Sequence, residues 1–173
     1  MPDLWHHRVG STPDLDALRH RVDGQWRAMT WSEAGARVRA IANGLLATGL
    51  AREQRCIVMS DTCVEWILAD FAILCAGGAT TTVYPAASDR EVEFIVGDSQ
   101  AVIAFVDGPA QVARLRTMRA NLPALIRVVV FRDGGAPTDP GHVVGGPHPG
   151  QVVGGPHPGH VVGGPHPGHV VGG

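Results

Sequence analysis

Residues with reactive side chains are few in this sequence. Asp61 and Glu65 stand four positions apart, a spacing that could hold two carboxylates together for acid–base chemistry. A helix cap explains Glu65 without catalysis, because a glutamate three residues after a threonine commonly caps a helix start. The cysteines are Cys56, Cys63 and Cys75, an odd number without a Cys-x-x-Cys pair. We therefore expect reduced thiols that pack as small hydrophobic side chains.

The chain contains no lysine, and each of its 14 basic residues is an arginine. No Schiff base and no lysine-containing phosphate loop can therefore come from these residues. The 14 basic residues nearly balance 16 acidic ones without a basic cluster, so we expect no nucleic-acid partner. Arg114, Arg116 and Arg119 are predicted on the solvated side of one helix, with binding of an anionic partner as the alternative.

Histidines gather at the two ends of the chain. His6, His7 and His20 are expected on exposed loops, where a metal site is the alternative to plain solvation. Residues 141–173 repeat the nonapeptide GHVVGGPHP, whose histidines are His142, His148, His157, His160, His166 and His169. Ordering such a glycine- and proline-rich segment costs about 1–2 kcal/mol per residue with little apolar burial, so we expect disorder. Weak copper or zinc binding by the repeat stays open, but we assign no metal-ligating residue.

The chain has no obvious signal for a membrane or for export. No apolar run approaches the roughly 20 residues that cross a bilayer, so we expect no transmembrane segment. The first residues, MPDLWHHRVGSTPD, lack the basic start and the apolar stretch of a secretory leader. Together with the unpaired cysteines, this favours a cytoplasmic location.

Turn and cap signals predict where the elements that position these residues begin. Asp23-Gly24, between two short β-prone runs, predicts a hairpin with a type I′ turn over residues 21–31. We expect Trp26 and Trp31 to pack from this hairpin onto the domain that follows. Three capping boxes predict helix starts, and they are Thr30-x-x-Glu33, Thr62-x-x-Glu65 and Ser88-x-x-Glu91.

The spacing of apolar residues predicts four helices. The first ends at Gly49 and buries a face made of Ala34, Val38, Ile41, Ala42 and Leu45. The second, over residues 64–76, is apolar almost all round, as in a buried helix, and ends at Gly77-Gly78. The third is short, around residues 91–98. The fourth begins near Pro109 and ends before Pro123, with a buried side made of Val112, Leu115, Met118 and Leu122.

Short runs rich in β-branched residues lie between these helices. They cover residues 56–60, 80–84, 102–106 and 126–131, and they are apolar without strict alternation. Strands covered on both faces have this composition. The sequence therefore predicts an α/β fold with an open, mostly parallel sheet and helices on both faces. We expect this domain to occupy residues 1–140 and the repeat tail to occupy residues 141–173.

Three segments follow one another in the order WRAMTWSEAGARVRAIANGLLATGL, CIVMSDTCVEWILADFAILCAGGATTTVYPAAS and REVEFIVGDSQAVIAFV. In this order they resemble the N-terminal part of the adenylate-forming, AMP-binding enzymes, and most of all the long-chain fatty acid–CoA ligases. Within them the likeness rests on Thr30-Trp31-x-Glu33, Gly44-Leu45, Glu65-Trp66, Ala69-Asp70-Phe71-Ala72, Ala76-Gly77, Tyr84-Pro85 with Ser88, and Asp98-Ser99. The chain departs from the family pattern at Glu53-Gln54-Arg55-Cys56, where Gly-Asp-Arg-Val is usual, and at Ala76-Gly77-Gly78-Ala79 and Thr82.

The resemblance implies a reaction that this chain alone is not equipped to perform. The family joins a fatty acid to ATP as an acyl-adenylate and then transfers the acyl group to coenzyme A, with Mg²⁺ present. Positioning ATP takes a phosphate loop and a lysine, and the chain matches neither. Gly77-Gly78 precedes a predicted strand and is better explained as a helix C-cap. We therefore expect an inactive, partial N-terminal domain that binds no cofactor by itself, with no catalytic and no cofactor-binding residue.

Two other functions stay open at this point. One is a stand-alone α/β module that binds a nucleotide or a protein at the carboxyl ends of the strands, near Ser60, Pro85 and Asp107. The other is a histidine-rich repeat protein that binds metal weakly. An incomplete sheet would also leave apolar surface uncovered, so self-association is expected.

Overall fold

Helices and strands alternate along most of the chain, as the sequence predicts. The computed structural model describes residues 2–131 and 152–154. The helices are α1 (Pro2–Ser11), α2 (Trp31–Ala47), α3 (Val64–Cys75), α4 (Asp89–Asp98), α5 (Pro109–Thr117) and the short 3₁₀ turn η1 (Arg119–Asn121). The strands are β1 (Asp16–Val22), β2 (Gln25–Thr30), β3 (Arg55–Met59), β4 (Ala79–Thr82), β5 (Ile103–Val106), β6 (Arg127–Val130) and β7 (Val152–Gly154).

The described strands form two sheets. β1 and β2 pair antiparallel as a hairpin, and the larger sheet has the strand order β4-β3-β5-β6-β7. β4, β3, β5 and β6 run parallel, and β7 pairs antiparallel with β6. The predicted α/β class, an open and mostly parallel sheet preceded by a hairpin, is therefore confirmed.

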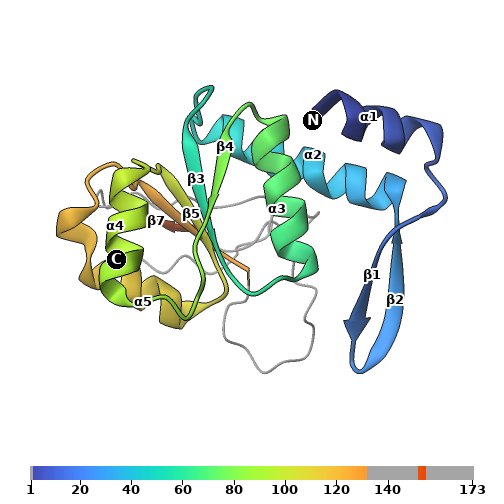
Figure 1. Cartoon of the computed structure of the whole chain (residues 1–173). Coiled ribbons are helices and arrows are strands. Elements are labelled where there is room, and N and C mark those ends of the chain that lie inside the picture. The colour runs from blue at the N-terminus through green and yellow to red at the C-terminus, as the bar shows by residue number, and fades with distance from the viewer. Residues whose placement is uncertain (1, 132–151, 155–173) are drawn as a thin grey trace.

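Helices cover both faces of the larger sheet, with α2 and α3 on one side and α4 and α5 on the other (Figure 1). Successive side chains of a strand point to opposite faces. Cys56 and Val58 of β3 therefore pack into the core shared with α2 and α3, whereas Ile57 and Met59 pack into a second core with α4 and α5. All four are fully buried. Burial on both faces explains why the strand sequences are apolar without alternation.

The apolar faces predicted for the first and fourth helices are confirmed. The buried residues of α2 include Ala34, Val38, Ile41, Ala42 and Leu45. On and just after α5, the buried residues include Val112, Leu115, Met118 and Leu122. The second predicted helix, α3, is less buried than its composition suggests, because only half of its residues are buried, namely Val64, Glu65, Leu68, Ala69, Ala72 and Ile73.

The hairpin has the predicted turn but not all of the predicted packing. Asp23 and Gly24 have φ angles of 49° and 78°, as a type I′ turn requires. Trp31 packs inward as expected, with its ring centroid 5.5 Å from that of Trp5. The expectation for Trp26 is wrong, since this side chain is 70% exposed. The hairpin projects beyond the helices (Figure 1), so the outer end of β2 has little core to pack against.

An N-terminal helix, α1, is present although the sequence pattern does not predict one. Its one buried residue is Trp5, which stacks on Phe71 of α3 with ring centroids 4.1 Å apart. A close approach to α2 is possible because position 35 is glycine, and a Cβ there would lie 2.7 Å from a methyl group of Val9. With so little apolar periodicity, α1 depends on tertiary packing rather than on an amphipathic pattern.

Two of the three predicted capping boxes are present. Thr30 with Glu33 caps α2, and Ser88 with Glu91 caps α4, each with both reciprocal hydrogen bonds. The box predicted at Thr62 is wrong, because the N-cap of α3 is Cys63 and makes no side-chain cap bond. At the C-terminal ends, Gly49 and Gly77 have φ angles of 88° and 83° and stop α2 and α3 as predicted.

The repeat lies largely outside the described residues. Within it, Val152–Gly154 forms β7, with Val153 paired to Val128 of β6. The expectation of disorder therefore differs from the structure at these three residues. The rest of the predicted tail, and with it the boundary expected at residue 140, falls outside the part of the chain that the structure describes.

Candidate functional site

The carboxyl ends of the parallel strands meet at one edge of the larger sheet, which we call the carboxyl edge. The chain passes from β3 outward to β4, then returns past β3 to β5 and β6. The connecting helices change face at this point, since α3 packs on one side of the sheet and α4 and α5 on the other. In open α/β sheets, ligands bind outside the carboxyl ends of the strands where the connections diverge. In this fold that switch point lies between β3 and β5.

Two of the three positions expected near a ligand, Ser60 and Asp107, lie at this switch point, and Asp61 lies beside them. The backbone N–H of Asp61, just after β3, donates to Oδ2 of Asp107, just after β5, over 3.4 Å. Ser60 donates its hydroxyl hydrogen to the carbonyl of Asp61 at 2.7 Å and lies 3.6 Å from the sulfur of Cys63. The Oδ1 atom of Asp107 is shielded and has no hydrogen-bond partner among the described residues. Within the described residues, the arrangement places carboxylates, and not a cation for a phosphate, directly after β3 and β5.

Pro85, the third position expected near a ligand, lies in the loop between β4 and α4. Its carbonyl accepts a hydrogen bond from the Arg114 guanidinium at 3.0 Å. Arg114 also donates to the carbonyl of Ala87 and, at 2.6 Å, to the carboxylate of Asp89. The Arg114 side chain is only 17% exposed. A solvated position for Arg114 is therefore wrong, because this guanidinium ties α5 to the loop that borders the carboxyl edge.

The neighbouring arginines differ from Arg114. Arg116 is exposed, as predicted for the solvated side of the helix. Arg119 is half-buried and donates to the carbonyl of Leu122, so its predicted solvation is also wrong. These three side chains therefore do not form one exposed patch.

The cysteines are free thiols held in their neutral form. Cys56 is buried in the sheet, and desolvation raises its pKa to about 12. Desolvation, with the nearby carboxylate of Glu65, raises the pKa of Cys63 to about 11. Burial also raises the pKa of Cys75. Thiols with raised pKa values are poor nucleophiles, which agrees with a packing role.

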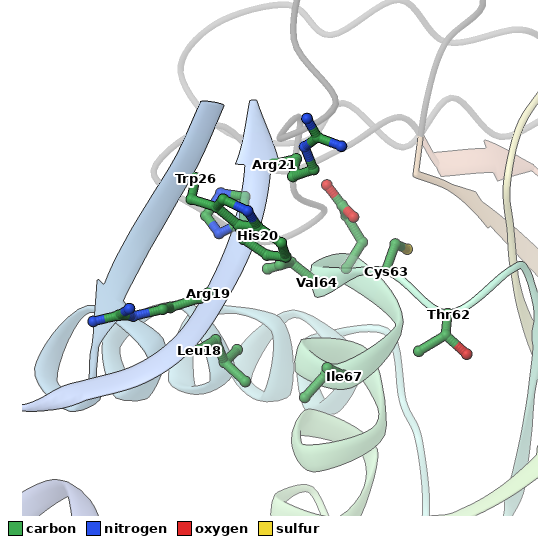
Figure 2. Close-up of a pocket in the computed structure, with 10 residues that line it drawn as sticks. Leu18, Arg19, His20, Arg21, Trp26, Thr62, Cys63, Val64 and Ile67 are labelled. Carbon is green, nitrogen blue, oxygen red and sulfur yellow. The ribbon is translucent and has the colours of Figure 1, made fainter. Parts of the chain in front are cut away.

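Glu65 and Asp61, which the sequence offered as a possible acid–base pair, lie in different surroundings. Glu65 is buried, with 1% of its surface exposed, whereas Asp61 is exposed. Glu65 makes no cap bond, since the N-cap residue Cys63 precedes it by only two positions. It lines a pocket of about 400 Å³ between the hairpin and the start of α3 (Figure 2). This pocket was not predicted from the sequence, because its two walls are about 40 residues apart in the chain.

The N-terminal histidines do not lie on loops as expected. His6 and His7 are exposed on α1, while His20 is half-buried on β1. In residues 2–131 and 152–154, no group of three histidine, cysteine or acidic side chains is arranged to hold a metal ion. The tail histidines lie outside the described residues. Among the described helices, none has the length and apolar character to cross a membrane.

Two solved structures with the same architecture are described as CoA ligases. The anthranilate CoA ligase AuaEII, in complex with anthranoyl-AMP, superposes with a TM-score of 0.67 at 22% identity, covering 75% of this chain and 24% of that protein. A protein described as a long-chain-fatty-acid CoA ligase from Rhodopseudomonas palustris CGA009 has a TM-score of 0.68 at 24% identity, covering 79% of this chain and 33% of that protein. The fold is thus that of the N-terminal domain of adenylate-forming enzymes.

Sequence comparison places the chain within a family. The model described as AMP-binding enzyme matches residues 5–157, and the chain belongs to this family. The long-chain-fatty-acid–CoA ligase FadD15 of Mycobacterium tuberculosis is 32% identical over 123 residues, which cover 71% of this chain and 20% of FadD15. The ligase heimdall of Drosophila melanogaster is 29% identical over 133 residues, covering 75% of this chain and 20% of heimdall. The chain spans about a fifth of the length of these relatives.

Proposed function

We propose that this chain supplies the N-terminal α/β unit of an AMP-forming long-chain fatty acid–CoA ligase. The observation that carries the proposal is the 32% identity to FadD15 over 123 residues. It agrees with the open sheet and its switch point at β3 and β5, which is the scaffold on which such enzymes build a ligand crevice. In the complete enzyme, the partners would be a fatty acid, ATP with Mg²⁺, and coenzyme A.

By itself, this unit contributes scaffold and no catalytic group. Forming an acyl-adenylate requires cations against the triphosphate and against the charge that develops in the transition state. The sequence has no lysine, and the aspartates that follow β3 and β5 at the carboxyl edge, Asp61 and Asp107, are acidic. Two carboxylates would repel a triphosphate unless Mg²⁺ intervened. We therefore assign no catalytic and no cofactor-binding residue, and we propose that the isolated chain is inactive.

A chimera of FadD15 tests this proposal. The 123-residue matching segment of FadD15 is replaced by the matching segment of this chain, and ATP–pyrophosphate exchange is measured with palmitate. The chimera should retain exchange because the replaced part is scaffold. The chain alone, assayed beside heat-denatured chain, should show none. A chimera that folds cooperatively yet lacks exchange would refute the scaffold role, and exchange by the chain alone would refute its inactivity.

Nucleotide binding by the free-standing chain is the second candidate, and the Oδ1 atom of Asp107, which has no partner among the described residues, favours it. A carboxylate at a switch point can accept hydrogen bonds from ribose hydroxyl groups. Calorimetric titration with AMP, ATP and coenzyme A would detect such binding, and Asp107→Asn should weaken it. Absence of heat with all three compounds would eliminate this candidate and leave the scaffold role.

Cytoplasmic location and self-association also belong to this proposal. Large apolar side chains are exposed on several elements, including Trp26 at 70%, Tyr84 at 85% and Phe94 at 68%. Their burial against a second copy would remove apolar area from water. Sedimentation velocity should show oligomers whose fraction grows with concentration, and a single monomer peak at all concentrations would contradict this expectation. Fluorescent-fusion microscopy tests the location.

A further inference from the structure

β4 is the outermost strand on one side of the larger sheet. Its one neighbour among the described strands is β3, and β7 lies at the opposite side of the sheet (Figure 1). The backbone N–H of Ala79 donates to the carbonyl of Gln54 at 2.9 Å, and that of Val83 donates to the carbonyl of Val58 at 3.1 Å. These bonds bind β4 to the sheet along its inner side only.

Thr80 and Thr82 present their backbone N–H and C=O groups on the outer side of β4. Successive N–H groups of a strand point to opposite sides, and the residues before and after each threonine face β3. No hydrogen bond of these outward groups is found within the described residues. Thr82 is exposed and Thr80 is half-buried, so another strand can reach this row of groups. Such a row at a sheet edge is a template for strand pairing.

The sequence of this edge favours pairing rather than opposing it. Residues 79–84 read ATTTVY and contain no charged residue and no proline. Charged side chains and prolines are what natural edge strands use to prevent pairing. Threonine, valine and tyrosine are also good strand formers. Pro85 follows directly, so pairing is confined to this short segment.

We propose that β4 pairs antiparallel with β4 of a second copy of this chain, which continues the sheet across a two-fold axis. Thr80 then exchanges backbone hydrogen bonds with the partner's Thr82, and Thr82 exchanges them with the partner's Thr80. This register is self-complementary, because outward-facing residues meet outward-facing residues on both strands. Thr81 lies opposite the partner's Thr81 at the axis, in a pair without hydrogen bonds.

The same register gives the exposed Tyr84 ring a place to pack. Tyr84 is 85% exposed, and it comes opposite the partner's Gly78, where the missing side chain leaves room for a ring. An aromatic residue paired across from a strand glycine is a known stabilising arrangement. Arg52 lies beside Gly77, is 89% exposed, and can approach the partner's ring as a cation–π contact.

The pairing gives the self-association proposed above a defined surface, and it rests on that self-association. A two-fold contact uses the edges of both copies at once, so the product is a closed dimer rather than a fibre. So short an edge buries less than the roughly 1,600 Å² of a standard interface. We therefore expect a weak dimer, with a Kd in the micromolar range.

Sedimentation velocity of the full chain over a range of concentrations tests the edge. Thr82→Pro removes an outward N–H and keeps the inner bonds of β4, so it should raise the dimer Kd at least about tenfold. Thr82→Val keeps the N–H and is the matched control, which should change the Kd less than about threefold. Circular dichroism melts verify folding, and Thr82→Lys, which adds a charge to the edge, carries the test should Thr82→Pro not fold.

Disulfide cross-linking tests the register. In an antiparallel pair without hydrogen bonds, the Cα atoms lie about 4.5 Å apart, which is within the range of a disulfide. Thr81→Cys should therefore form a covalent dimer on oxidation by copper–phenanthroline in air. Thr82→Cys, which faces the partner's Thr80, should not. Both variants carry Cys63→Ser and Cys75→Ser, because these native thiols are only half-buried.

The possible failures can be told apart. A chain that sediments as a monomer at all concentrations would overturn both the edge contact and self-association. Oligomers that persist unchanged in folded Thr82→Pro or Thr82→Lys would overturn the edge contact and leave self-association through another surface. Absence of a Thr81→Cys dimer, or equal cross-linking of Thr81→Cys and Thr82→Cys, would overturn the proposed pairing.

Discussion

Replacing Arg114 by alanine should destabilise the protein far more than a change on a solvated helix face. The guanidinium of Arg114 makes hydrogen bonds to the carbonyls of Pro85 and Ala87 and an ion pair with Asp89. Its partners belong to the loop between β4 and α4 and to the start of α4, whereas Arg114 lies on α5. The substitution therefore removes the polar link between two neighbouring helices and the loop at the carboxyl edge.

The size of the effect depends on the exposure of each partner. Hydrogen bonds from a charged donor contribute about 1.5–3 kcal/mol each, and partial hydration of the two half-buried carbonyls lowers this to roughly 1–2 kcal/mol. Asp89 is 75% exposed, and an exposed ion pair adds only about 0–1 kcal/mol. Arg114→Ala should therefore cost about 2–4 kcal/mol, and Asp89→Asn should cost less than about 1 kcal/mol.

Urea unfolding followed by tryptophan fluorescence measures both variants. Arg116→Ala is the matched control, because Arg116 is exposed on the same helix. A loss of about 2–4 kcal/mol corresponds to a fall in Tm of about 6–12 °C for a domain of this size. Amide hydrogen exchange should also accelerate in the loop over residues 83–88. Equal unfolding midpoints for Arg114→Ala and Arg116→Ala, at equal m-values, would refute the reasoning.

Three further predictions concern caps, a glycine contact and the thiols. Ser88→Ala should lower the free energy of unfolding by about 1 kcal/mol, because it removes the α4 cap. Thr62→Ala, which removes no cap, should change it by less than about 0.5 kcal/mol. Equal losses of the two variants in urea unfolding would contradict this. Gly78→Ala should lower the free energy of unfolding by about 1–3 kcal/mol, because the new Cβ would lie 3.2 Å from the carbonyl oxygen of Gln54 and 3.1 Å from Ile73. Gly44→Ala should raise it by about 0.5–1 kcal/mol, because a Cβ at this position of α2 meets nothing within 4 Å. Differential scanning calorimetry compares the two, and a lower Tm for Gly44→Ala would count against it. Burial raises the pKa of Cys56 to about 12 and that of Cys63 to about 11, from an ordinary value of 9.0. As the pH rises, the thiols therefore lose their protons in the unfolded state before they do so in the folded state. The free energy of unfolding should therefore fall as the pH rises above 9 toward 12. The double variant Cys56→Ala and Cys63→Ala should show a smaller fall in urea midpoint between about pH 8 and pH 10, and an identical fall would exclude the thiols as its cause.

Most of the fold could be predicted because its signals are local. Asp23-Gly24 determines its turn through backbone conformation alone, and Ser88 with Glu91 completes a cap within four residues. The strands are recognisable because burial on two faces gives an uninterrupted apolar run. Parallel pairing then follows from the alternation of strands with helices.

The failures share a cause, which is that partners distant in sequence decide the outcome. Arg114 is 25 to 29 residues from the groups that it binds, so its helix position alone suggested solvation. Glu65 matched a cap pattern, but the N-cap of α3 is Cys63 and not Thr62, and Glu65 is buried beside the pocket between the hairpin and α3. Trp26 is exposed because the hairpin extends past the helices, a property of tertiary placement rather than of β2 itself.

Within the candidate site, the sequence predicted the edge but not its polar connections. Parallel strands place Ser60 and Asp107 at the same end of the sheet, as their positions after β3 and β5 suggested. The hydrogen bond between Asp61 and Asp107 depends on the order β4-β3-β5, which could not be derived from the alternation of elements alone. The pocket beside Glu65 depends in the same way on how the hairpin sits against α3.

The attachment of α1 has a consequence for motion in this protein. The helix is attached to α2 and α3 by Trp5, which stacks on Phe71 and lies edge-on to Trp31, and by Val9 against Gly35, so we expect it to detach before the strands separate. Detachment would uncover Trp31 and the side of Phe71 at once, so quenching of indole emission by acrylamide would report the open population while the sheet stays intact. Tryptophan emission therefore reports whether the N-terminal helix is docked on α2 and α3.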